Sequence, residues 1–346
     1  MDRFVDLAQR VRTHICYAHV FGDALTEEQL VERCAPAAPG AVRMELARLD
    51  DEGAVERVEG LWFLSGEAVE GLGAIKRCGE VAAEAILRDH GALLALVRRL
   101  PFVRMLAVSG SVAWRNHGRR NGKALDLDLF LITAPRGVHV VRLLLRAWGL
   151  GEAWASRLGW RRPRAPICAN YITDGDVLDV TNKSFYTASD ALNVRVLKGP
   201  NEYRRFVEAN AWMGRYYPIG APGGRTTRAP SRSLPLAVVN TACFMVLAAC
   251  SWLKLLLTNW RRGERQPFAY SLRFRYDTET SLVRSAPAGG GRQPQVACRF
   301  EKVYTRHFGR DEGLLSFLFP GTTKEGVYTS DGHVRSRIVA PLGYHE

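Results

Sequence analysis

Two acidic residues in one alternating segment constrain this chain more than any other feature of its sequence. Residues 125–132 read LDLDLFLI, and the alternation over their first half is typical of a half-buried β-strand. Because successive side chains of a strand point to opposite faces, Asp126 and Asp128 are expected on one face and the leucines on the other. Two carboxylates one strand repeat apart form a site of hard oxygen ligands, which suits Mg²⁺.

A second apolar run precedes this strand and ends in a Ser-Gly-Ser sequence. Residues 104–108 read RMLAV, which predicts a buried strand that runs into Gly110 and Ser111. A glycine lets the backbone approach a phosphate closely, and a serine at a helix start adds a hydroxyl and an amide. Nucleotidyl transfer needs a metal, a cradle for the leaving pyrophosphate and a carboxylate near the attacking hydroxyl. The pattern therefore indicates phosphate chemistry.

This arrangement resembles the nucleotidyltransferase superfamily with a polymerase beta-like fold, whose signature is Gly-Ser, a spacer, and Asp-x-Asp between hydrophobic residues. Over residues 18–217 it is also similar to bacterial nucleotidyltransferase-like proteins that carry an N-terminal winged helix. The resemblance implies that Gly110 and Ser111 cradle the phosphates and that Asp126 and Asp128 bind the metal. The spacer here is longer than the family's and basic.

Two cations of that spacer, Arg115 and Lys123, are candidate contacts for a triphosphate or an acidic acceptor. A solvated loop explains them equally well.

The superfamily places a third carboxylate on a later strand. Residues 167–173 and 176–181 flank Asp174-Gly175, a pair that predicts a two-residue β-hairpin turn. That register sets Asp179 beside Asn170, which makes Asp179 the candidate base toward the acceptor; an acid that faces water is the alternative. Asp190 is a second candidate. If neither reaches the site, the fold would bind a nucleotide without turning it over.

The first 66 residues predict three helices and a hairpin. Thr26 and Gln29 form a capping box, a third helix runs from Pro39 toward Gly53, and Glu59-Gly60 joins two short strands. This order is typical of a winged helix. Its third helix carries more acids than bases, which favours a protein contact or a structural role over DNA binding.

The fold class expected for the whole chain is α/β (α+β). It comprises a winged-helix domain (1–66), a helical connector (67–100), a nucleotidyltransferase domain with a mixed β-sheet flanked by helices (101–217), a linker (218–235) and a helical C-terminal region (236–346). Residues 234–253 contain no charge and are long enough to span a bilayer. A buried helix is favoured there, and membrane association is the alternative.

Composition bounds the partners and the compartment. Lys and Arg number 48 against 35 Asp and Glu, and the net charge of +13 favours nucleotides, nucleic acid or anionic lipid as partners. Seven cysteines without a C-x-x-C pair indicate free buried thiols in a reducing, cytoplasmic setting. The N-terminus lacks the apolar core of a signal peptide, so export is not expected.

The expected reaction is metal-dependent transfer of a nucleoside monophosphate from an NTP, with ATP the expected donor, to an acceptor hydroxyl. Mg²⁺ or Mn²⁺ is the expected cofactor. A small-molecule acceptor is favoured, with RNA, DNA or protein as alternatives. A catalytically inactive nucleotide sensor, with a winged helix that binds a partner or DNA, is the alternative function.

Overall fold

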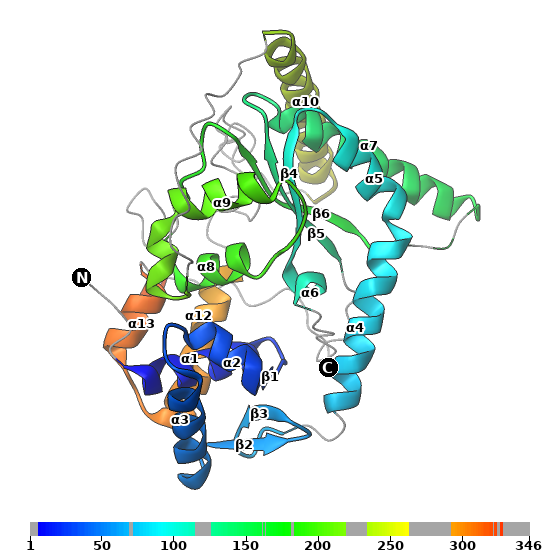
Figure 1. Cartoon of the computed structure of the whole chain (residues 1–346). Coiled ribbons are helices and arrows are strands. Elements are labelled where there is room, and N and C mark those ends of the chain that lie inside the picture. Colours follow the sequence, from blue (N-terminus) through cyan, green and yellow to red (C-terminus); the bar gives the residue numbers. More distant parts are fainter. Residues whose placement is uncertain are drawn as a thin grey trace.

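The computed structural model describes residues 6–68, 72–114, 126–160, 162, 164–180, 183–218, 234–262, 292–320, 322–323 and 326–327. It is a mixed α/β protein in which helices lie on both sides of a central sheet (Figure 1). The N-terminal elements gather beneath that sheet, next to the last helices of the chain (Figure 1).

The N-terminal elements include the three helices and the hairpin that the sequence predicts, and a further short strand that it does not predict. In order they are α1 (Leu7–Val20), β1 (Leu25–Thr26), α2 (Glu27–Cys34), α3 (Pro39–Asp51), β2 (Val55–Val58) and β3 (Leu61–Leu64). The capping box is present, because Thr26 Oγ1 accepts from the Gln29 amide at 3.2 Å and Gln29 Oε1 accepts from the Thr26 amide at 3.0 Å. The turn residues Glu59 and Gly60 both have positive φ, as a tight hairpin turn requires.

The central sheet has the strand order β6-β5-β4-β7. Its strands are β4 (Val103–Ser109), β5 (Leu127–Thr133), β6 (Ile167–Asp174) and β7 (Arg195–Lys198). β4 is antiparallel to both β5 and β7, whereas β5 and β6 are parallel. Both predicted strands of the Gly-Ser and Asp-x-Asp pattern are therefore confirmed, and they are direct neighbours.

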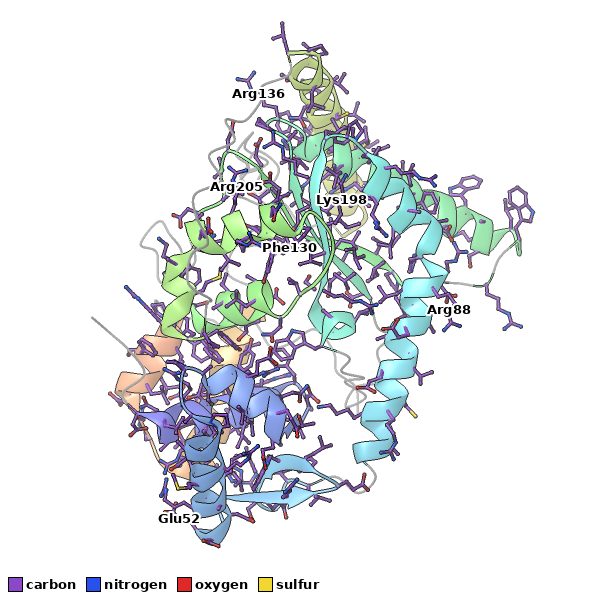
Figure 2. All side chains as sticks on the ribbon, viewed as in Figure 1. Glu52, Arg88, Phe130, Arg136, Lys198 and Arg205 are labelled. Carbon is purple, nitrogen blue, oxygen red and sulfur yellow. The ribbon has the colours of Figure 1, made fainter. Side chains whose placement is uncertain are left out.

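The alternation along β5 divides the molecule into two hydrophobic clusters. Leu127, Leu129 and Leu131 pack with α5 (Gly91–Arg99) and α7 (Val138–Arg157). Phe130 points to the other face, where its ring centroid lies 5.0 Å from that of Phe206 on α9 (Pro200–Ala209) (Figure 2). The even positions of β5, including Asp128, therefore belong to the face that α8 (Phe185–Leu192) and α9 cover.

The connector between the N-terminal elements and β4 is two helices rather than one. α4 (Leu72–Asp89) ends before the buried His90, and α5 begins at Gly91. The His90 Nε2 atom lies 3.0 Å from the carbonyl oxygen of Ala165, so the break serves a tertiary contact. On the other side of the sheet, α9 is followed by the short 3₁₀ helix η2 (Ala211–Arg215).

The hairpin predicted for residues 167–181 is wrong. The first half is β6, and the chain does turn after Asp174, but residues 177–180 are not a strand. β6 pairs with β5 instead, and the buried side chain of Asn210 bonds the segment that follows: its Nδ2 donates to Leu178 O at 2.7 Å and its Oδ1 accepts from Val180 N at 2.8 Å. Asn170 and Asp179 are therefore not cross-strand partners.

The uncharged segment forms α10 (Leu234–Arg262), but the expectation that it is a buried helix is wrong for most of its surface. Ala237, Asn240 and Leu247 are buried, whereas Val238 and Met245 are 65% and 62% exposed. Asn240 Oδ1 accepts from the His139 backbone amide at 2.8 Å, which fixes α10 to the first turn of α7. Among the residues that the structure describes, no helix combines the length and apolar character needed to cross a membrane.

The last described helices return to the N-terminal elements. α12 (Arg292–Phe308) packs on α1, and α13 (Glu312–Leu318) follows it. Gln9 Nε2 donates to Asp311 Oδ2 at 3.0 Å, and the Arg12 guanidinium lies 5.3 Å from the Phe308 ring centroid. Residues of α1, α8, α12 and α13 share one hydrophobic cluster. The short strands β8 (Thr322–Thr323) and β9 (Gly326–Val327) form a separate pair.

The expectation of free thiols is confirmed, but most of them are not buried. All seven cysteines are free. Cys16 and Cys34 are buried in the cluster around α1, while Cys78, Cys250 and Cys298 are exposed. The difference arises because Cys16 and Cys34 lie on the covered faces of their helices, whereas the exposed three lie on uncovered faces.

Candidate active site

The Gly-Ser pair and the second acid of the Asp-x-Asp pattern meet at one end of the β4–β5 ladder. Ser109 is the cross-strand partner of Asp128, and both side chains are buried. Gly110 comes next and starts the short helix α6 (Gly110–Ala113) with φ +65°, a conformation that L residues rarely adopt. A Cβ atom on Gly110 would overlap Oδ2 of Asp128 and lie 3.1 Å from its Cγ. Glycine is therefore required here for two independent reasons.

Asp128 sits in the middle of the sheet rather than at its edge. Its neighbours in register are Ser109 on β4 and Cys168 on β6, and its side chain is 6% exposed. A register shift follows immediately on β6, because Phe130 pairs with Tyr171. Such a bulge bends a strand and redirects its side chains.

Asp126 lies just before β5 and is half-buried. Two carboxylates are enough to hold Mg²⁺, because this ion completes its shell with water and phosphate oxygens. The donor set of Asp126 and Asp128 and the bare backbone at Gly110 therefore fit a magnesium–phosphate group. No group of three or more His, Cys, Asp or Glu residues that could hold a metal ion occurs among the described residues.

Neither candidate for the third carboxylate is placed beside Asp128 by a described contact. Asp179 is 59% exposed at its side chain and forms an ion pair with Lys183 at 3.4 Å. Asp190 is half-buried on α8. The pKa of Tyr17 is raised mainly by burial, and the charge of Asp190 adds a smaller contribution.

A third acid, Asp174, is buried but lies at the far end of the sheet. Its carboxylate accepts from the Arg136 and Asp176 amides at 2.6 and 3.1 Å, and burial raises its pKa. Since β5 and β6 are parallel and Thr133 pairs with Asp174, this carboxylate is separated from Asp128 by the length of β5.

Three further residues were predicted to contact the nucleotide, and only one of them lies among the described residues. Ser111 is half-buried in α6, next to Gly110. Arg115 and Lys123 lie outside the described residues.

An aromatic contact that the sequence does not reveal joins this site to the N-terminal elements. Trp114 follows α6 directly, and the Arg33 guanidinium lies 5.2 Å from its ring centroid. The rings of Tyr17 and Phe21 lie 6.0 and 5.9 Å from it. Arg33 belongs to α2, and Tyr17 belongs to α1. The helix that carries the Gly-Ser pair is thus held by side chains from the first two helices, and no short-range pattern could indicate this.

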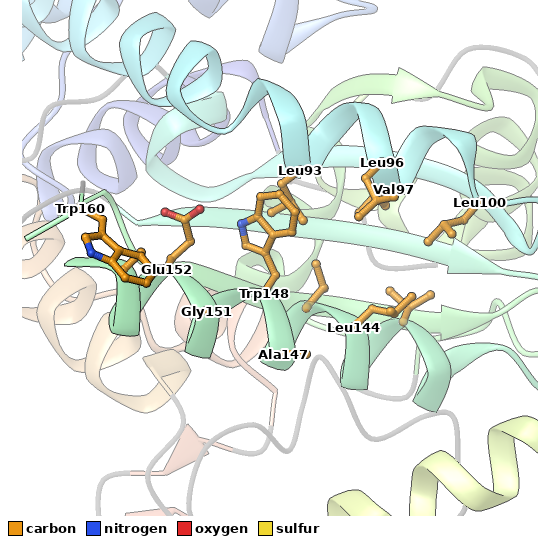
Figure 3. Close-up of a pocket in the computed structure, with 13 residues that line it drawn as sticks. Leu93, Leu96, Val97, Leu100, Leu144, Ala147, Trp148, Gly151, Glu152 and Trp160 are labelled. Atoms are coloured by element: carbon orange, nitrogen blue, oxygen red, sulfur yellow. The ribbon is translucent and has the colours of Figure 1, made fainter. Parts of the chain in front are cut away.

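A cavity of about 550 Å³ lies between α5 and α7, on the opposite face of the sheet (Figure 3). Its lining is apolar, including Leu93, Trp148 and Trp160, apart from Glu152, which forms an ion pair with Arg164 at 2.8 Å. Because Asp128 belongs to the other face of β5, this cavity is separate from the carboxylates.

Comparisons with family models, with curated proteins and with solved structures give no match to this chain. The features of this chain that bear on its function are the contact of Gly110 with Asp128 and the position of Asp126 just before β5.

Proposed function

We propose that this chain is a metal-dependent nucleotidyltransferase, built from a polymerase beta-like core with an N-terminal winged helix. It transfers a nucleoside monophosphate from an NTP, ATP in the first instance, to a hydroxyl group of a small-molecule acceptor. One observation carries the proposal: the positive-φ glycine after β4 presents bare backbone directly against the buried carboxylate of Asp128. A phosphate chain and its metal need these two groups side by side.

Each residue has a definite part in this reaction. Asp126 and Asp128 hold Mg²⁺ or Mn²⁺, which when bound neutralises charge on the phosphate oxygens. Gly110 lets the phosphates approach the main chain, and Ser111 offers a hydroxyl donor to them. The acceptor oxygen forms a bond to the α-phosphorus while the bond from that phosphorus to the bridging oxygen breaks. Pyrophosphate leaves with the electron pair, and the acceptor proton passes to a carboxylate or to solvent.

A small acceptor is favoured over nucleic acid because the cations of α3 are already paired. Arg48 forms ion pairs with Glu45, at 2.6 Å, and with Glu52. Arg43 is paired with Glu27, also at 2.6 Å. Neutralised guanidinium groups release few counterions from a phosphate backbone, so this helix is a weak candidate for a DNA-reading helix.

The test is turnover by the purified full chain with Mg²⁺ or Mn²⁺, each α-labelled NTP and a cell extract as the source of acceptors. Asp128→Asn removes the charge at the buried carboxylate, and Asp179→Asn makes the same chemical change at an exposed one. We expect label transfer by the wild type and by Asp179→Asn, but not by Asp128→Asn. Label transfer by Asp128→Asn at the wild-type rate would contradict the assignment of Asp128 as a metal ligand.

A nucleotide-sensing regulator is the second candidate, and the exposed ion pair of Asp179 with Lys183 favours it. A site with two carboxylates and no third can bind a metal–nucleotide complex without activating an acceptor. Calorimetric titration with Mg²⁺–ATP distinguishes the candidates. Binding that Asp128→Asn abolishes, without label transfer to any fraction of the extract, assigns the sensor function.

A further inference from the structure

Helix α10 carries apolar side chains on the side that faces the protein, such as Leu247, and also on the side that faces outward. Its polar residue Asn240 is 2% exposed and faces the protein, where its Oδ1 atom accepts from the His139 and Val140 amides at 2.8 and 3.4 Å. Large apolar side chains of the same helix point outward instead. Val238, Met245 and Leu253 are 65%, 62% and 55% exposed. The outward face of a helix in contact with water is ordinarily polar.

The outward residues form one continuous face. At about 100° per residue, Val238, Val239, Met245, Val246, Leu253 and Leu257 share one side of α10, opposite Asn240 and Leu247. In Figure 1, α10 projects beyond the sheet. An exposed apolar face of this extent on a folded chain marks an interaction surface. No described element covers it, as the exposures show.

Charge identifies the partner. The sequence contains no Asp or Glu between Glu208 and Glu264, while Arg and Lys occur on both sides of the apolar stretch, among them Arg228, Arg232, Arg261 and Arg262. A second copy of this chain would bring the same basic flanks against these in either orientation, so it offers no complementary charge. Anionic headgroups above an apolar interior complement both features at once.

We propose that the outward face of α10 docks on an anionic lipid surface, so that the protein is a peripheral membrane protein. The helix lies in the interfacial region with Asn240 and α7 on the side of the protein. Its apolar side chains enter the boundary between headgroups and acyl chains, and the basic sequence on both sides of the helix attracts anionic headgroups. This docking neither requires α10 to cross the bilayer nor depends on the nucleotidyltransferase activity.

The experiment is flotation of the full chain with vesicles of phosphatidylcholine, either pure or with about one third phosphatidylglycerol. The test variant is Met245→Gln/Val246→Gln/Leu253→Gln, which makes the face polar without touching Asn240 or Leu247. The matched control is Met44→Gln/Val58→Gln/Val81→Gln, which changes exposed apolar residues on other elements. Circular dichroism and thermal unfolding establish that both variants are folded.

We expect the wild type and the control to float with the anionic vesicles, and the test variant to bind at least tenfold more weakly. Binding to anionic vesicles should also fall when salt is raised to about 0.5 M, because the headgroup contribution is screened. Wild-type protein that floats with neither vesicle overturns the proposal. So does a wild type that sediments as a dimer which only the test variant dissociates, because a second copy then occupies the face.

Discussion

The carboxylate of Asp128 lies directly against the backbone of Gly110. A Cβ atom at position 110 would overlap this carboxylate. We expect Gly110→Ala to lower affinity for Mg²⁺–ATP and turnover by more than about tenfold, because the new methyl group displaces the Asp128 carboxylate. Equilibrium binding and label transfer measure the two effects.

The matched control is Gly53→Ala. Gly53 has nearly the same φ, +67°, but open space around the position of a Cβ atom. Both variants therefore carry the cost of a left-handed alanine, about 1 kcal/mol. Equal activity in the two variants would show that contact with Asp128 is unimportant.

Trp114 is expected to hold α6 in place from the side of the N-terminal helices. Trp114→Ala removes the contacts with Arg33, Tyr17 and Phe21, so we expect Mg²⁺–ATP binding to weaken by about 1 kcal/mol, roughly fivefold in Kd. Trp148→Ala is the control, because Trp148 is also half-buried but lines the cavity on the other face of the sheet. The same loss of affinity in both variants would contradict a specific role for Trp114.

Asn210 should be among the most costly polar residues to replace. Its side chain is fully buried and bonds Leu178 O, Val180 N and Phe206 O, so Asn210→Ala leaves buried backbone groups without partners. We expect a loss of about 3 kcal/mol in the free energy of unfolding, measured in urea. Asn193→Ala removes the bond of a half-buried side chain to Ser189 O and its contact with Tyr217, and should cost only about 1 kcal/mol. Similar losses would show that the segment after β6 does not depend on Asn210.

His139 is expected to make the fold sensitive to mild acid. Burial, followed by the charge of Arg142, lowers the pKa of His139 to about 4. The unfolded chain then binds a proton that the folded chain does not, so stability is lost as the pH falls from about 6.5 toward 4. The His139→Phe variant can still pack on Phe244. Between pH 7 and pH 5 its free energy of unfolding should fall by about 2 kcal/mol less than that of the wild type. Parallel urea-unfolding profiles for the two proteins would refute this.

Short-range patterns predicted the elements whose hydrogen bonds and turn conformations involve only neighbouring residues. The capping box at Thr26 and Gln29 and the turn at Glu59 and Gly60 need no distant partner, and both are confirmed. The strands of the Gly-Ser and Asp-x-Asp pattern also form, but β5 begins at Leu127, so Asp126 lies outside the strand that was predicted to carry both acids.

The predictions that failed concern partners distant in the sequence. The turn signal at Asp174-Gly175 is real, but β6 pairs with β5 and the segment after the turn bonds the side chain of Asn210. The contact of Trp114 with Arg33 joins residues 81 positions apart, and no periodic pattern in the sequence indicates it. The uncharged segment 234–253 had the composition of a core, yet only one stripe of α10 is covered.

The contact of α1 with α12 has a consequence for how the protein is made. Phe300 and Tyr304 of α12 are buried in the same cluster as Val11 and Ile15 of α1, although almost the whole chain lies between them. During synthesis, α1 therefore emerges from the ribosome long before α12, which covers one side of it. Its apolar side must stay shielded by provisional contacts or by a chaperone until α12 arrives. The packing of α1 is therefore completed only after α12 has been synthesised.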